Sequence, residues 1–194
     1  MQTTRGTSLT DEPSSLVETS REGRVIALWG FVALTVFAAD QASKWWAERS
    51  LSDGVPRPLL GDWLQLRLTH NPGAAFSVGT GYTIALSVIA LAVIAVCVTM
   101  SRRIKSGWWA IALGLLLGGA LGNVTDRIFR QPGPLRGHVV DFLQLPHWPV
   151  FNLADSAICV SAALFVVLSL RGIRLDGTVD RGQGSGRDRH SAVS

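Results

Sequence analysis

The stretch FNLADSAICVSAALFVVLSL, residues 151–170, is apolar over most of its length and is long enough to cross a membrane as a helix. Its one charged residue is Asp155. A carboxylate at the mouth of a membrane helix is costly to keep there, which favours a functional role. Asn152 and Asp155 also have the spacing of a capping box, in which side chains satisfy the free N–H groups of a helix start. This stretch alone leaves both interpretations open.

Three earlier apolar runs, residues 25–47, 83–100 and 108–124, are each near the ~20 residues that span a bilayer. With a last span over residues 150–170, they predict an all-α membrane protein with four transmembrane helices. No small-residue cleavage site follows the first run, so we expect it to be retained instead of removed as a signal peptide. Tryptophans lie at the ends of the runs, as in interfacial aromatic belts: Trp45, Trp46, Trp108, Trp109 and Trp148. Glycines at every fourth position of the third run predict close approach of another helix: Gly114, Gly118 and Gly122.

The composition also points to lipid. Of the 194 residues, 47% are hydrophobic and 16% are charged, whereas an average soluble domain has about 25% charged residues. Basic residues flank the apolar runs and do not gather on one face, which argues against nucleic-acid binding. Cys97 and Cys159 both fall inside apolar runs, where they suit packing better than a disulfide or a metal site. We therefore expect no cofactor.

The distribution of basic residues predicts the orientation in the membrane. The short connection over residues 101–106 carries three basic residues and no acid, and two arginines follow the last span. Cytoplasmic loops carry such an excess, so this connection and both termini are expected on the cytoplasmic side. That side receives 11 of the 18 Lys and Arg residues. The longer connections, residues 48–82 and 125–149, are then extracytoplasmic.

Outside the spans, the sequence predicts two tails and a small sheet. Residues 1–22 and 172–194 are polar and are expected to be disordered, leaving residues 23–171 as the membrane domain. Residues 63–69, WLQLRLT, alternate apolar and polar side chains, which predicts a strand. The turn signal Asn-Pro-Gly follows, and residues 74–77 could return as a second strand. We expect an outer-face β element around residues 57–78 lying on the membrane surface, the alternative being an exposed loop.

Three more aspartates lie at the edges of apolar segments, and two of them have basic neighbours. Asp40 and Lys44 are four residues apart, so they can pair on one helix face. Asp126 is next to Arg127 and shares a helix face with Asn123. An arginine nearby keeps a carboxylate ionised, so we expect Asp40 and Asp126 to hold structure.

Asp141 and Asp155 differ, because both have apolar neighbours and no basic residue within four positions. Two such carboxyl groups brought together titrate as a coupled pair that shares a proton. One can then take a proton from water while the other donates one to the peptide being cleaved. No serine–lysine pair offers a competing mechanism, and the four histidines lack the HExxH spacing of a zinc site.

Five sequence blocks occur in this order: DQASK (residues 40–44), HNPGAAF (70–76), GGALGNVTDR (118–127), VVDF (139–142) and FNLADSA (151–157). Together they resemble the signature blocks of bacterial lipoprotein signal peptidase, also called signal peptidase II. The resemblance covers about residues 25–170 and includes the four-helix frame. Residues 129–135 make the connection before VVDF longer than is usual in the family, while the blocks on both sides are intact.

The resemblance implies an aspartic endopeptidase of the bacterial cytoplasmic membrane. It would act as a monomer among membrane lipids and cut a prolipoprotein just before its diacylglyceryl-modified cysteine, on the extracytoplasmic side. The family's catalytic pair corresponds to Asp141 and Asp155. Its substrate-binding or supporting residues correspond to Asp40, Lys44, Asn71, Gly73, Asn123, Asp126, Arg127, Asn152 and Ala154.

Two alternatives are weighed against this interpretation. A small proton-coupled membrane carrier could also use intramembrane aspartates. It would need a path through both faces, whereas the aspartates cluster at one, and no internal repeat is detectable. A presenilin-like aspartyl protease would need a Gly-x-Gly-Asp block, which GNVTD at residues 122–126 does not match.

Overall fold

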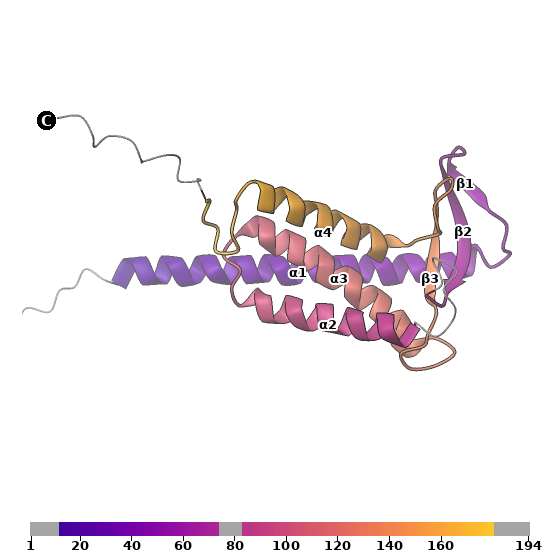
Figure 1. Cartoon of the computed structure of the whole chain (residues 1–194), viewed down its shortest axis with the longest axis horizontal. Coiled ribbons are helices and arrows are strands. Elements are labelled where there is room, and N and C mark those ends of the chain that lie inside the picture. The colour runs from indigo at the N-terminus through magenta and orange to yellow at the C-terminus, as the bar shows by residue number, and fades with distance from the viewer. Residues whose placement is uncertain (1–11, 74–82, 181–194) are drawn as a thin grey trace, which may run out of the picture.

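The computed structural model describes residues 12–73 and 83–180, which form four long helices and one three-stranded sheet (Figure 1). The helices are α1 (Glu12–Ser50), α2 (Thr83–Ser101), α3 (Gly107–Phe129) and α4 (Leu153–Leu170). Each contains a segment long and apolar enough to cross a bilayer, so the four predicted spans are confirmed. The helices run alongside one another, and the sheet covers one end of the bundle (Figure 1).

The first helix is longer than predicted at both ends. It begins at Glu12, so the expectation of disorder is wrong for residues 12–22. Once a helix is nucleated, each further residue adds a hydrogen bond at small cost, and Pro13 is tolerated because it stands in the first turn. Helix α3 likewise continues to Phe129, beyond the predicted end at residue 124.

The segment after α4 is also more structured than predicted. The expected tail began at residue 172, but residues 172–180 fold back as a turn in which Ile173 bridges to Val179. The Trp109 indole donates to the Ile173 carbonyl at 2.9 Å, and the Lys105 amide donates to the Leu175 carbonyl at 2.9 Å. These bonds hold the turn against the start of α3. The remainder of the predicted tail, residues 181–194, lies outside the described residues.

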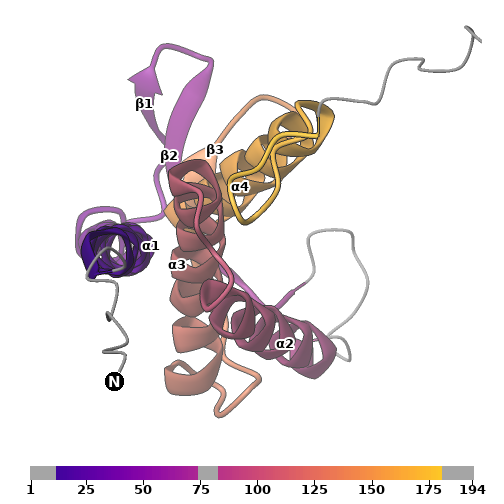
Figure 2. The ribbon, with the colours of Figure 1, turned by 90° about the vertical axis from the view of Figure 1, so that its left-hand side faces the viewer.

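Helix α3 is the centre of the bundle and contacts the other three helices (Figure 2). The predicted close approach at its glycines is confirmed, and the partner at Gly114 and Gly118 is α1. A Cβ atom at Gly118 would lie 2.6 Å from the Ala33 carbonyl oxygen and 2.7 Å from Val36 Cβ. The absent side chains therefore let the two backbones approach closely.

The sheet consists of β1 (Arg57–Leu60), β2 (Leu64–Asn71) and β3 (Val139–Gln144), antiparallel in this order. Strand β2 confirms the strand predicted from the alternation at residues 63–69. Its predicted partner, residues 74–77, lies outside the described residues. Strand β3 was not predicted, and it pairs Val139 with Asn71 and Asp141 with Thr69. This pairing carries Asp141 from a distant part of the chain to the sheet end of the bundle.

Candidate active site

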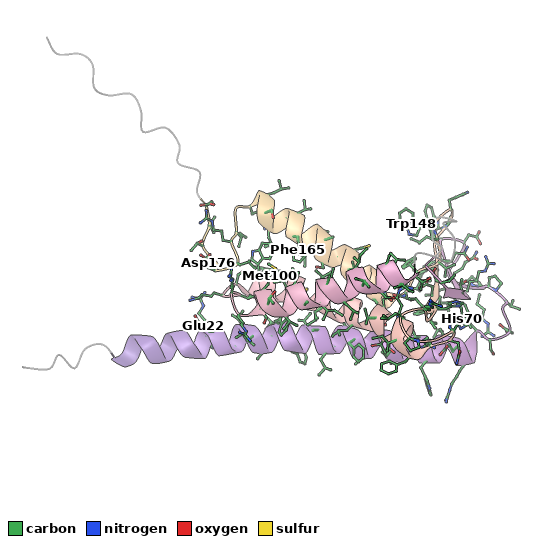
Figure 3. The ribbon with its side chains drawn as sticks, turned by 60° about the horizontal axis from the view of Figure 1, so that its bottom comes forward. Glu22, His70, Met100, Trp148, Phe165 and Asp176 are labelled. Carbon is green, nitrogen blue, oxygen red and sulfur yellow. The ribbon has the colours of Figure 1, made fainter. Side chains whose placement is uncertain are left out.

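The predicted site residues converge at the sheet end of the bundle, where five helix and strand segments meet. His70 and Trp148 mark this end, and Glu22 and Asp176 mark the opposite one (Figure 3). The contributing elements are the outer parts of α1 and α3, the strands β2 and β3, and the start of α4. The buried polar and charged side chains brought together here are Asp40, Lys44, Asp126, Arg127, Asp141 and Asn152.

Asp141 is held in β3 by two amide groups. Its Oδ2 accepts from Asn71 Nδ2 at 2.9 Å, and its Oδ1 accepts from Asn152 Nδ2 at 2.7 Å. Only 1% of the residue is exposed, and this burial raises the pKa of its carboxyl group from 3.8 to about 7. Among the described residues, no lysine or arginine forms an ion pair with it. Asp141 is thus a buried carboxyl group that can change protonation near neutral pH.

Asp155 stands in the first turn of α4 and completes the capping box. Its backbone N–H donates to Asn152 Oδ1 at 2.9 Å, and its Oδ2 accepts from the Asn152 N–H at 3.3 Å. The capping interpretation is therefore confirmed. Asp155 Oδ1 makes a further contact, accepting from Asn123 Nδ2 at 2.8 Å. Because the same Asn152 side chain donates to Asp141, one asparagine links the two carboxyl groups.

Lys44 is the cation at the centre of the surrounding polar network. Its Nζ lies 2.8 Å from Asp40 Oδ2, 2.8 Å from Asp126 Oδ2 and 3.1 Å from Asn123 Oδ1. The predicted pair of Asp40 with Lys44 is confirmed, and both side chains are fully buried. Asp40 also accepts from the Ala154 N–H at 2.9 Å, which ties the start of α4 to α1.

Asp126 is ion-paired as predicted, but the expected partner is wrong. Its Oδ1 accepts from Arg130 Nε at 2.7 Å, and its Oδ2 pairs with Lys44. Adjacent helical residues point in different directions, whereas residues four apart share a face, so Arg130 reaches the carboxylate. Arg130 was not predicted as a site residue, although its four-residue spacing from Asp126 was a visible signal. Glu48 was not predicted either, and it pairs with the Arg130 guanidinium across the fold.

Arg127 lies instead beside the carboxyl pair. It interacts electrostatically with Asp141, Asp155 and Asp126, so the pair has a cation nearby that the local sequence did not reveal. Its NH1 is buried and has no hydrogen-bond partner among the described residues. Gly73 faces this guanidinium, since a Cβ atom there would lie 3.8 Å from both of its terminal nitrogens. The Gly73 N–H donates to Asn71 Oδ1 at 2.8 Å, which holds this turn beside the site.

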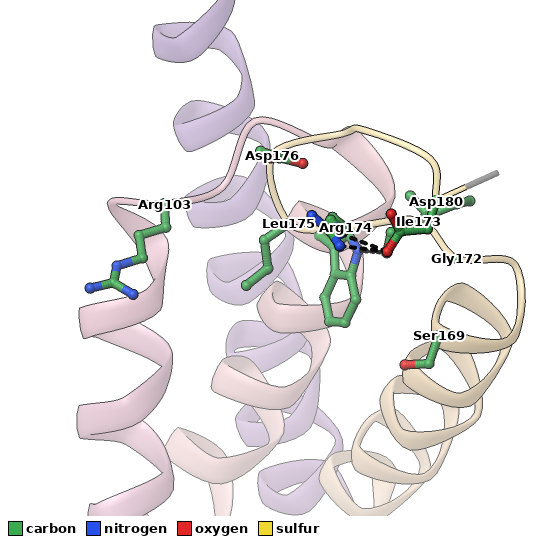
Figure 4. A pocket seen from close by; sticks show the side chains of 9 residues that line it. Arg103, Ser169, Gly172, Ile173, Arg174, Leu175, Asp176 and Asp180 are labelled. Carbon is green, nitrogen blue, oxygen red and sulfur yellow. Dashed lines mark hydrogen bonds and ion pairs between the residues drawn. The ribbon is translucent and has the colours of Figure 1, made fainter. Parts of the chain in front are cut away.

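Within residues 12–73 and 83–180, no group of three or more His, Cys, Asp or Glu side chains could hold a metal ion. An open cavity of about 530 Å³ is lined in part by Asp176, which marks the end of the bundle away from the carboxyl pair (Figure 3). Figure 4 shows that it is lined by Arg103, Trp109 and the turn after α4, in which Arg174 pairs with Asp180. This cavity contains none of the predicted site residues.

The chain is similar to known proteins in both sequence and fold. The family model for signal peptidase (SPase) II matches residues 32–171. A lipoprotein signal peptidase of Mycobacterium avium (strain 104) is 49% identical over 172 residues, covering 88% of this chain and 94% of that protein. One from Streptomyces coelicolor is 49% identical over 164 residues, covering 84% and 80%. A bacterial membrane enzyme solved by the in meso method at 1.9 Å resolution is 26% identical, with a TM-score of 0.64, covering 73% of this chain and 91% of that one.

Proposed function

Because the chain belongs to the signal peptidase II family of aspartic peptidases, we propose that it cleaves signal peptides from prolipoproteins with Asp141 and Asp155 as its catalytic pair. The observation that carries this assignment is Asn152, whose amide donates to Asp141 while its carbonyl accepts from the Asp155 N–H. The Asn152 backbone N–H also donates to Asp155 Oδ2 at 3.3 Å, so both carboxyl groups accept a hydrogen bond from one residue. The aspartates gather at one end of the bundle, so the carrier alternative has no support.

The chemistry follows from a pair that shares one proton. The ionised carboxylate takes a proton from water, and the water oxygen attacks the carbonyl carbon of the scissile peptide. The neutral carboxyl group donates its proton to the nitrogen of the leaving amine, so charge and protons balance when the C–N bond breaks. The raised pKa of Asp141 favours this residue as the one that carries the shared proton before substrate binds.

Arg127 is assigned to substrate binding. Its buried NH1 lacks a hydrogen-bond partner among the described residues, although an unsatisfied buried donor costs about 1–3 kcal/mol. A peptide carbonyl of the substrate would satisfy this donor beside the carboxyl pair. A guanidinium there would also stabilise negative charge that develops on the attacked carbonyl oxygen.

The placement of the pair relative to the spans supports a lipid-modified substrate. Asp155 stands in the first turn of α4, a candidate membrane span, so a bound cysteine beside it would lie at the bilayer edge. Its diacylglyceryl chains could then remain among lipid tails while the peptide before it reaches the carboxyl groups. Leu60 and Trp63, exposed by 68% and 78% near the β1–β2 turn, support the interpretation that the sheet lies on the membrane surface.

One further feature supports the proposed side of the membrane. The basic residues of the α2–α3 connection lie at the end of the bundle opposite to the carboxyl pair, which supports an extracytoplasmic active site.

The proposed function is tested with purified full-length protein in lipid nanodiscs. A diacylglyceryl-modified prolipoprotein and the same protein without the modification are incubated with it, and the products are analysed by mass spectrometry. We expect cleavage immediately before the cysteine of the modified substrate only. Failure to cleave either substrate would refute the proposed function, and equal cleavage of both would refute the requirement for the lipid.

A further inference from the structure

We propose that Arg130, anchored by Glu48, is a positioning residue that sets both the geometry and the charge of the carboxyl pair through Asp126. This inference rests on the proposed function. Arg130 follows the end of α3 and is only partly exposed, with 25% of its side chain accessible. Its Nε donates to Asp126 Oδ1 at 2.7 Å, and its NH1 pairs with Glu48 Oε1 on α1. One guanidinium therefore joins the end of α1 to a buried carboxylate at the end of α3.

The first path from Arg130 leads to Asp141. With its Oδ1 held by Arg130, the Asp126 carboxylate directs Oδ2 toward the Val140 N–H, which donates to it at 3.3 Å. Val140 directly precedes Asp141 in β3 and is fully buried. The orientation of the Asp126 carboxylate therefore holds the strand at the residue next to the catalytic carboxyl group.

The second path leads to Asp155. Asp126 Oδ2 is also 2.8 Å from Lys44 Nζ, and the same ammonium group donates to Asn123 Oδ1 at 3.1 Å. The other end of the Asn123 amide donates to Asp155 Oδ1 at 2.8 Å. Arg130 thus acts on both members of the pair, through Val140 on one side and through Lys44 and Asn123 on the other.

Arg130 also adds positive charge close to the carboxyl pair. Asp40 and Asp126 are two buried carboxylates that share the single ammonium group of Lys44. Arg130 supplies a second cation to Asp126, while Glu48, its other partner, lies on the outer side of the guanidinium. The other charged groups facing the pair are Arg127 from α3 and the pair's own carboxylates, from β3 and α4. Without Arg130 the site becomes more negative, which disfavours ionisation of the carboxyl pair and moves its titration to higher pH.

Arg130 has a charged neighbour on its outer side as well. Glu48 lies 3.7 Å from His70 Nε2, so a protonated His70 would compete with Arg130 for the same carboxylate.

Arg136, in the connection between α3 and β3, offers a matched control. It is exposed, and no side-chain hydrogen bond or ion pair is found for it among the described residues.

The test compares Arg130→Gln, Arg130→Lys, Glu48→Gln and Arg136→Gln with the wild-type chain in nanodiscs, using the diacylglyceryl-modified prolipoprotein. Rates are measured from pH 5 to 9 and normalised to folded protein. For Arg130→Gln we expect kcat to fall about 10- to 100-fold, KM to stay within about 3-fold, and the pH optimum to rise by about half a unit or more. Arg130→Lys should restore the pH optimum, because it restores the charge, with only part of kcat. Glu48→Gln should lower kcat several-fold, and Arg136→Gln should match the wild type.

The proposal is overturned if folded Arg130→Gln keeps the wild-type kcat and pH profile, or if Arg136→Gln shifts the profile equally. Should Arg130→Gln fail to fold, Glu48→Gln decides the question, because an unchanged kcat in that variant contradicts the anchoring role. Failure of the wild-type chain to cleave the substrate would instead refute the proposed function, so the two failures are distinguishable.

Discussion

Asp141 and Asp155 are held by different groups, although one asparagine links them. Among the described residues, Asp141 accepts from the side-chain amides of Asn71 and Asn152, whereas Asp155 also takes part in the cap of α4. Asparagine has nearly the shape of aspartate but cannot exchange the catalytic proton. We therefore expect Asp141→Asn and Asp155→Asn each to lower the cleavage rate by at least about 10³-fold.

The measurement is the single-turnover rate on lipidated substrate, with thermal unfolding as the control for folding. Groups that act as a unit give non-additive losses, so the double variant should be no slower than either single variant. Near-normal turnover by one folded single variant would remove that residue from the mechanism.

The raised pKa of Asp141 predicts how stability depends on pH. The unfolded chain loses this proton near pH 3.8, whereas the folded chain keeps it until about pH 7. As pH rises through this window the unfolded state binds fewer protons, so this carboxyl group progressively destabilises the fold. The Tm of the wild type should therefore fall relative to that of Asp141→Asn between pH 4.5 and pH 7.5. Parallel Tm curves for the two proteins would contradict the raised pKa.

In the proposed mechanism, Asp126 contacts the supporting ion-pair network and not the scissile bond. Its replacement should therefore affect stability more than the chemical step. Asp126→Asn leaves Lys44 and Arg130 with a weaker acceptor, and we expect a loss of about 1–3 kcal/mol of folding free energy. Cleavage should be slower but measurable when rates are normalised to folded protein. Complete inactivity of a variant that accumulates and unfolds normally would contradict this division of roles.

At the scale of elements, the contact between α1 and α3 decides where Lys44 meets Asp126. Gly118 lies against the Ala33 carbonyl and Val36, so a leucine there would force the helices apart. We expect Gly118→Leu to destabilise the protein by at least about 1–3 kcal/mol, measured by thermal unfolding in detergent. Gly30→Leu is the matched control, because a Cβ atom at Gly30 meets nothing within 4 Å. Equal Tm values for the two variants would contradict the close helix contact.

The sheet shows how elements far apart in sequence assemble one site. Strand β3 pairs with β2, so Asn71 on one strand reaches Asp141 on the other at 2.9 Å. The start of α4 then brings Asn152 to the opposite carboxylate oxygen. Each element supplies one or two groups, and the pair forms only where all of them meet.

At the scale of the whole molecule, the orientation in the membrane is testable with reagents that cannot cross the bilayer. In a chain with Cys97 and Cys159 replaced by alanine, a cysteine at Gly54 should be labelled in intact cells. A cysteine at the exposed Arg103 should be labelled only after lysis, because its connection carries the basic residues typical of the cytoplasmic side. Labelling of Arg103→Cys in intact cells would reverse the orientation and place the carboxyl pair on the cytoplasmic face.

Local sequence patterns were enough to predict the four spans, the strand β2 and two of the contacts made within one helical turn. A bilayer requires helices whose backbone groups are satisfied internally, so apolar length alone identifies the spans. Asp40 with Lys44 and Asn152 with Asp155 follow from positions three or four apart on a helix. These features depend on neighbours along the chain.

Long-range packing selects the groups that surround the carboxyl pair. Asn71 reaches Asp141 across 70 residues of sequence, and Arg130 reaches Glu48 across 82. No local spacing specifies such contacts, because they depend on which helix faces pack and which strands pair. For the same reason the local sequence around Asp126 suggested Arg127, whereas the packed bundle directs Arg127 to the carboxyl pair and leaves Asp126 with Lys44 and Arg130.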